Sequence, residues 1–108
     1  MKSTVELREQ LLARRDELAD RVQRIGADLH RREEPLSADF AEQVVEQENL
    51  DVLHSLEIEG RVELARVERA LARLERGQHN ICSRCGEEIS PARLAALPYA
   101  DTCIRCAD

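Results

Sequence analysis

With 108 residues, 35% of them charged and only 2% aromatic, the chain is too short for two globular domains and too poor in large side chains for a thick hydrophobic core. Its formal net charge of −6 argues against direct DNA binding, because DNA-binding proteins neutralise phosphates with Lys and Arg. No apolar run is long enough to span a bilayer, and the N-terminus does not resemble a signal peptide. We therefore expect a cytoplasmic protein of long, solvated helices, with no membrane segment.

The first predicted element is an amphipathic helix from Ser3 to Glu34. This range contains no proline, and its only glycine is Gly26. Apolar side chains recur every three or four residues, as they do on one face of a helix, at Leu11, Leu18, Val22, Ile25 and Leu29. A helix of roughly 30 residues is about 45 Å long. Pro35 ends it, because proline lacks an N–H group and disfavours helical geometry at the preceding residue.

A second helix is predicted from the turn at residues 34–39 to Arg76. Ser37 or Asp39 can cap its start, and Glu42, three residues after Asp39, completes a pattern that resembles a capping box. The apolar residues again have helical spacing, with Gly60 in the same register; they are Val44, Leu50, Leu53, Leu64, Val67, Leu71 and Leu74. Gly77 is a typical residue at which a helix ends.

Two helices with one apolar stripe each, joined by a short turn, pack in antiparallel orientation because neither can bury its stripe alone. We expect a coiled-coil hairpin over residues 1–77. A turn centred near residue 36 places Val22 opposite Leu50, Leu18 opposite Leu53, and Leu7 opposite Leu64. The second helix is then expected to extend past the first toward the cysteines. We expect a monomer, and a homodimer of longer helices is the competing arrangement.

Charge is unevenly distributed along this hairpin. Residues 35–60 contain seven acidic residues and no Lys or Arg. One interpretation is a negatively charged probe that enters a basic channel. In the other, the acidic side chains pair across the coiled coil with arginines of the first helix. That pairing joins Glu42, Glu46, Glu48 and Asp51 to Arg31, Arg32, Arg24 and Arg21. Both interpretations remain open at this point.

The most specific motif is a pair of C-x2-C sequences near the C-terminus. Cys82 and Cys85 are followed, after seventeen residues, by Cys103 and Cys106. This is the spacing of a zinc site, in which each pair forms a tight knuckle and four thiolates complete a tetrahedron. In a reducing compartment metal ligands are favoured over disulfides. We predict one structural zinc ion, which organises residues 78–108 as a finger.

The segment between the cysteine pairs has the signals of one short helix. Ser90 suits the N-cap and Pro91 the first helical position, whereas Leu97-Pro98 ends the helix. Leu94 and Leu97 are expected to cover the metal core.

These motifs together resemble the DksA/TraR family of C4-type zinc-finger proteins. The resemblance covers residues 36–106 and rests on the hairpin, on Gly77 and on the following segments: Cys82-Ser-Arg-Cys85-Gly86-Glu87-Glu88-Ile89, Arg93-Leu94, Pro98 and Cys103-Ile104-Arg105-Cys106. It implies a mainly α fold, a long antiparallel helical hairpin with a small C-terminal four-Cys zinc finger. It also implies binding to bacterial RNA polymerase, with the hairpin inserted in the secondary channel near the active-site magnesium, often together with the alarmone ppGpp.

The resemblance further implies that the hairpin tip contacts the polymerase. Well-studied members carry the pattern D-x-x-D-x-A there, which corresponds to residues 36–41. The second Asp and the Ala are present, whereas Leu36 replaces the first Asp. The candidate partner-binding residues are Asp39, Phe40, Ala41 and Glu42. Asp39 is alternatively a helix cap, and Phe40 is alternatively a plug for the end of the coiled coil. The chain lacks the extra N-terminal segment and C-terminal helix of larger members, so we expect a short paralogue.

The leading functional hypothesis is a non-enzymatic transcription regulator. The sequence offers no open metal position, Ser/His/Asp set or Gly-rich phosphate loop that would support catalysis. Three alternatives stay open. The first is a zinc-stabilised adaptor for another protein, and the second is a thiol redox sensor that loses zinc on oxidation. The third is a DNA-binding finger, which the acidic residues near its arginines disfavour.

Overall fold

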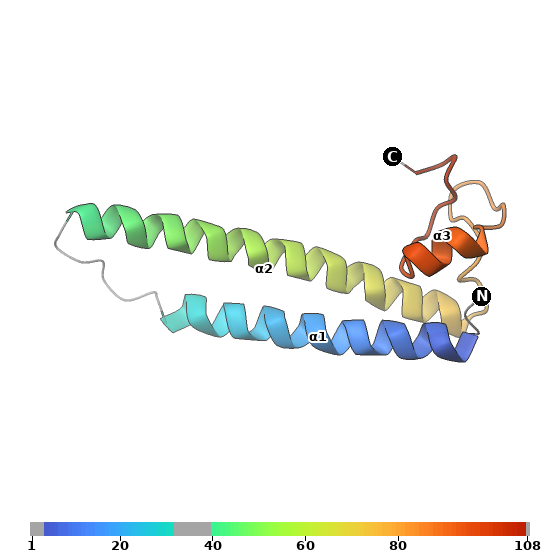
Figure 1. The fold of residues 1–108 in the computed structure, drawn as a ribbon, viewed down its shortest axis with the longest axis horizontal. Coiled ribbons are helices and arrows are strands. Elements are labelled where there is room, and N and C mark those ends of the chain that lie inside the picture. The colour runs from blue at the N-terminus through green and yellow to red at the C-terminus, as the bar shows by residue number, and fades with distance from the viewer. Residues whose placement is uncertain (1–3, 32–39, 108) are drawn as a thin grey trace.

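The computed structural model describes residues 4–31 and 40–107, and residues 40–42 only by their backbone. The described residues form three helices, which are in chain order α1 (Thr4–Arg31), α2 (Phe40–Glu75) and α3 (Pro91–Ala96). The two long helices run antiparallel, and the C-terminal segment with α3 folds at one end of them (Figure 1). The molecule is elongated, measuring 58 × 27 × 19 Å. The predicted mainly α hairpin with a small cysteine-bearing C-terminal unit is confirmed. In the described part of the chain, no helix combines the length and apolarity needed to cross a bilayer.

The end of α2 has the structure that Gly77 predicts. Gly77 adopts φ 69°, a left-handed conformation that residues with a side chain rarely adopt. Its N–H donates to Leu74 O at 3.1 Å, and the N–H of Gln78 donates to Arg73 O at 2.9 Å. This pair of bonds is a Schellman motif, which satisfies carbonyl groups at the helix end. The predicted turn and the caps at Ser37 and Asp39 lie outside the described residues.

One apolar seam holds the two long helices together. Its most buried members come from both helices and are Leu7, Leu11, Leu18, Val67, Ala70 and Leu74. Leu18 and Val67 are completely inaccessible to solvent. Leu64 and Leu71 pack against this cluster with partial exposure. The stripe predicted from helical spacing is therefore buried toward the finger end of the hairpin, whereas Val44, predicted as part of the same stripe, is 41% exposed.

The predicted register of the hairpin is wrong by about ten residues. A Cβ atom on Gly60 would lie 2.9 Å from Cγ2 of Val22, so Val22 faces Gly60 and not Leu50. A Cβ on Gly26 would lie 3.3 Å from the carboxylate of Glu57. The apolar seam, and not the position of Pro35, sets the pairing of the helices.

This register also reverses the expected overhang. At the finger end, Arg8 forms an ion pair with Glu75, so α1 and α2 finish nearly level there. At the other end α2 begins well beyond Arg31, the last residue of α1 (Figure 1). The second helix thus extends past the first away from the cysteines, and not toward them.

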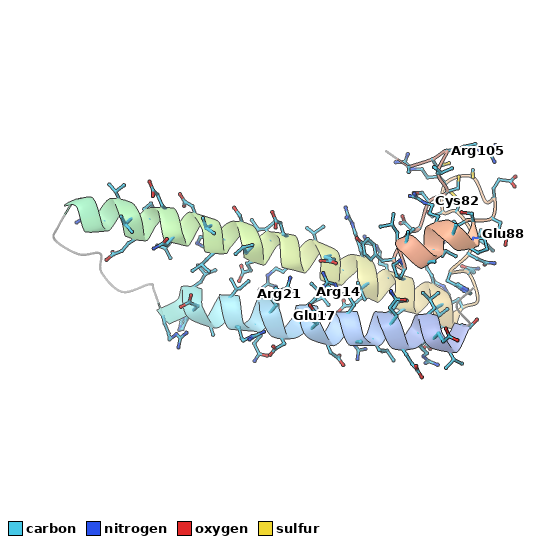
Figure 2. The ribbon with its side chains drawn as sticks, viewed as in Figure 1. Arg14, Glu17, Arg21, Cys82, Glu88 and Arg105 are labelled. Carbon is cyan, nitrogen blue, oxygen red and sulfur yellow. The ribbon has the colours of Figure 1, made fainter. Side chains whose placement is uncertain are left out.

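A bidentate ion pair joins the helices in the middle of the hairpin. Arg14 is labelled on α1 in Figure 2. It donates from Nε and Nη2 to Oε1 of Glu63 at 3.0 and 2.7 Å, and from Nη2 to Oε2 at 2.9 Å. The hydrogen bonds that Arg14 donates to the Glu63 carboxylate are the main reason that the pKa of Arg14 is raised above its usual value. Both side chains are partly buried, which makes such a pair more effective than an exposed one.

The Arg14–Glu63 pair was not predicted, and the predicted cross-hairpin pairs are not seen among the described side chains. Arg21 binds Glu17, Arg24 binds Asp20, and Arg31 binds Asp28, in each case one turn away on α1. The described acidic residues of the α2 overhang are thus not neutralised by these three arginines. The predicted partners Arg32 and Glu42 have no described side chains.

Candidate metal centre

The first cysteine pair lies in a tight knuckle between α2 and α3. The backbones of Ile81 and Glu88 form an antiparallel bridge, and Cys82 N–H donates to Glu87 O at 2.8 Å. Gly86 N–H donates back to Cys82 O at 3.0 Å, with Gly86 at φ 76°. The left-handed glycine turns the chain sharply, so that Cys82 and Cys85 point the same way.

Helix α3 and the loop after it carry the second pair to the same point. The N-cap prediction for Ser90 is confirmed, since its hydroxyl accepts from Arg93 N–H at 3.2 Å with Pro91 following. After the loop, Cys106 N–H donates to Cys103 O at 3.1 Å, which closes the second knuckle. Ser83 N–H donates to Asp101 O at 2.8 Å and ties the two knuckles together.

The four cysteines are positioned to bind one metal ion. All four Sγ atoms lie within 4.8 Å of one another, and the Sγ atoms of Cys85 and Cys103 are 3.7 Å apart. A tetrahedral zinc with Zn–S bonds of about 2.3 Å requires sulfurs about 3.8 Å apart, so the cluster fits this ion. All four are free thiols, and no disulfide joins them. With four protein donors such a site is closed to substrate.

Electrostatics at the cluster also favour a cation. Hydrogen bonds from the backbone N–H groups of Cys85 and Cys103 lower the pKa of Cys82 to about 6. The pKa of Cys106 is raised to about 12, chiefly by its hydrogen bond with the Cys103 sulfur. The pKa of Cys103 is also lowered, and hydrogen bonding to the neighbouring thiols raises that of Cys85, so two of the four thiols lose their protons more readily and the other two less readily. A divalent cation at the centre favours the deprotonated form of all four, because metal binding and thiol deprotonation are coupled.

A small apolar layer covers the sulfurs. Ile89 is completely buried against Cys82 and Cys103, and Leu94 of α3 packs on this cluster. The prediction for Leu94 is thus confirmed. Leu97 is 38% exposed and is not part of the cluster, so its predicted role in covering the metal core is wrong. Ile89, which follows directly after the bridge residue Glu88, takes that place instead.

The finger docks on the hairpin through two side chains. Tyr99 packs against the hairpin core from the loop after α3. Arg73 of α2 donates to the backbone oxygens of Gln78, at 3.1 Å, and of Ile81. The metal centre is therefore held at a defined place at the end of the rod.

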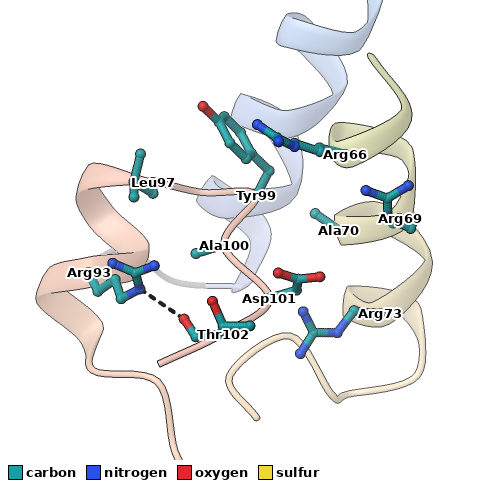
Figure 3. A pocket seen from close by; sticks show the side chains of 10 residues that line it. All are labelled: Arg66, Arg69, Ala70, Arg73, Arg93, Leu97, Tyr99, Ala100, Asp101 and Thr102. Carbon is teal, nitrogen blue, oxygen red and sulfur yellow. Dashed lines mark hydrogen bonds between the residues drawn. The ribbon is translucent and has the colours of Figure 1, made fainter. Parts of the chain in front are cut away.

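A groove lined by arginines lies between α2 and the finger, with a volume of about 470 Å³. Arg66, Arg69 and Arg73 project from successive turns of α2, and Arg93 comes from α3 (Figure 3). Arg93 donates to Thr102 O at 2.8 Å. Asp101 is the one acidic residue of the lining. This groove was not predicted from the sequence. The available signal was the spacing of the three α2 arginines, which places them on one helix face.

The backbone of Phe40, Ala41 and Glu42, three of the predicted tip residues, lies at the opposite end of the molecule. Asp39 is outside the described residues, and Phe40, Ala41 and Glu42 form the first turn of α2 without described side chains. Their role as partner-binding residues stays a prediction.

Two family models match consecutive parts of the chain. Residues 7–74 match the DnaK suppressor protein-like N-terminal domain, and residues 76–108 match the prokaryotic dksA/traR C4-type zinc finger. The chain belongs to the DksA/TraR family. The resemblance drawn from the cysteine motifs is confirmed, and the second of these models describes a zinc finger with four cysteines.

The chain is similar to a solved structure and to a curated protein. The transcription factor DksA2 from Pseudomonas aeruginosa is 30% identical, with a TM-score of 0.80 over 94% of this chain and 78% of that one. An uncharacterized protein of Aquifex aeolicus (strain VF5) is 39% identical over 70 residues. That match spans 65% of this chain and 46% of the Aquifex protein, so the chain covers about half of that relative.

Proposed function

We propose that this protein is a non-enzymatic transcription regulator that binds bacterial RNA polymerase. Cys82, Cys85, Cys103 and Cys106 hold one structural zinc ion, which fixes the finger at the base of the hairpin. The hairpin enters the secondary channel with Asp39, Phe40, Ala41 and Glu42 leading. The observation that carries this proposal is the likeness to the transcription factor DksA2 over most of both chains.

The shape and charge of the hairpin support the same function. Among the described residues, α2 extends beyond α1 at the outer end, and residues 40–59 of α2 contain no Lys or Arg. A narrow, negatively charged rod suits a channel with positive potential, and electrostatic complementarity increases the rate of association.

Transcription from a ribosomal promoter with purified polymerase tests the proposal. We expect the protein to change initiation and to associate with polymerase at micromolar concentration, and the Asp39→Asn variant to lose most of the effect on initiation while still binding. Absence of association at that concentration would favour the alternative of a zinc-stabilised adaptor. Cross-linking in cells would then capture a different protein.

The arginine groove supports a response to ppGpp, which the family resemblance implies. Arg66 and Arg69 have no hydrogen-bond or ion-pair partner among the described residues, and both line the groove beside Arg73 and Arg93. Guanidinium groups recognise phosphates through paired N–H donors. We propose that the diphosphates bind here when the protein is on the polymerase.

Replacing Arg66 and Arg69 by Ala tests the groove. We expect the concentration of ppGpp needed for a half-maximal effect on transcription to rise about tenfold or more, since each charge-assisted phosphate contact is worth about 1.5–3 kcal/mol. Arg76→Ala, at an exposed residue outside the groove lining, is the control and should leave that concentration unchanged. An unchanged ppGpp response in the double variant would count against this site.

A further inference from the structure

Helix α2 carries a second stripe of side chains that α1 does not cover. Its members follow each other at spacings of three and four residues, and therefore lie on one side of the helix; they are Val45, Glu48, Val52, Leu56 and Glu59. We name this stripe the acidic apolar face. All five side chains are exposed, and those of the apolar members are 55%, 58% and 45% accessible in chain order.

The acidic apolar face is distinct from the seam of the hairpin. Gly60, Leu64 and Val67 mark the side of α2 that contacts α1. The acidic apolar face adjoins that side and runs from the overhang of α2 into the paired part of the hairpin, over about 21 Å of helix. Single exposed apolar residues are common, but an aligned group of them is typical of a surface that binds another molecule.

Charge decides which kind of molecule fits this face. Residues 40–59 contain six acidic residues and no Lys or Arg. The nearby arginines of α1, Arg21, Arg24 and Arg31, already pair within their own helix. A second copy of the chain would bring two such acidic stripes together, and like charges in an interface are costly. The complementary surface is therefore basic.

We propose that the acidic apolar face docks on a basic surface of RNA polymerase in which Lys or Arg side chains surround apolar ones. This inference rests on the function proposed above and adds a lateral contact to the tip. Val52 and Leu56 lie at the centre of the contact and exclude water, whereas Glu48 and Glu59 pair with cations around it. The contact fixes how the rod is rotated about its axis, which insertion of the tip alone does not.

Two matched double variants test the proposal with polymerase core enzyme as the probe. In Val52→Ser with Leu56→Ser the face loses its apolar centre, and we expect binding to weaken about tenfold or more, as for central interface residues. Ile58→Ser with Val62→Ser is the control. These two residues are 61% and 47% exposed, much as Val52 and Leu56 are, but each lies six positions further along α2 and therefore points to another side of the helix. The control should bind as the unchanged protein does. Circular dichroism checks that both variants keep their helix content.

The outcomes separate this inference from the function on which it rests. If the unchanged protein does not bind polymerase, both fail. If it binds, and the two double variants bind equally well, the acidic apolar face is not the contact and only the further inference fails. A weaker dependence of binding on salt in Glu48→Gln with Glu59→Gln supports the basic partner. If sedimentation shows that the unchanged protein is a dimer and that the variant with Val52→Ser and Leu56→Ser is a monomer, the face binds a second copy and the inference is wrong.

Discussion

Replacement of Cys82 by Ser is expected to unfold the finger and leave the hairpin folded. The finger's own core contains only Cys82, Ile89 and Cys103 as buried residues. Three buried side chains are too few to offset the conformational entropy lost when a segment of this length becomes ordered. Residues 78–107 therefore depend on zinc, whose binding contributes about 10–16 kcal/mol in fingers of similar size. The measurement is zinc content per chain together with amide NMR signals from both parts.

In the Cys82→Ser variant, zinc content should fall from about one ion per chain toward none, as expected for a structural site that loses a ligand. Signals from residues 78–107 should collapse to positions typical of unfolded chains, and those of α1 should persist. Ser83→Ala, at the neighbouring exposed position, is the control and should keep both the metal and the signals. If the amide NMR signals of residues 78–107 keep the spread of chemical shifts of a folded protein in the absence of metal, the prediction is wrong. Simultaneous loss of α1 would contradict the division into residues 1–77 and 78–108, which itself stays a prediction.

The finger could be predicted from sequence because its signals act over a few residues. Gly77, Ser90 and Pro91 each specify a backbone conformation at one place, and the structure has the helix end and the cap at those residues. The C-x2-C spacing likewise constrains each knuckle locally, so convergence of the four sulfurs needs only that the two knuckles meet.

The register and the groove could not be predicted in this way. A slide of about ten residues is close to three helical turns and returns nearly the same stripe to the seam, so apolar spacing distinguishes the two pairings poorly. What distinguishes them is the fit of individual side chains, such as Val22 against Gly60. The arginine groove similarly requires knowing that the finger folds back beside Arg66 and Arg69, which the docking of Tyr99 determines.

Gly60→Leu is expected to destabilise the hairpin by about 3 kcal/mol, at the upper end of the cost of overpacking. Even a Cβ at this position would lie 2.9 Å from Cγ2 of Val22, and Gly60 is buried. Val22 cannot move away easily, because a β-branched side chain has one preferred rotamer in a helix. Leucine favours the helix over glycine by up to about 1 kcal/mol, so the cost of the clash with Val22 has to exceed that gain for the variant to be destabilised. Urea unfolding followed by circular dichroism measures the net change.

Gly26→Leu is the matched control, because it is also a mid-helix glycine at the interface of the two helices. Its nearest neighbour would be the Glu57 carboxylate, at 3.3 Å, which is the mobile end of a flexible side chain. We expect a loss below about 1 kcal/mol there, since the carboxylate can turn toward solvent and leucine favours the helix. Adding Val22→Ala to Gly60→Leu should restore part of the lost stability, because it makes room at the same point of the seam. If Gly60→Leu were as stable as Gly26→Leu, Val22 would not face Gly60, and the shifted register, with the overhang of α2 that depends on it, would be wrong.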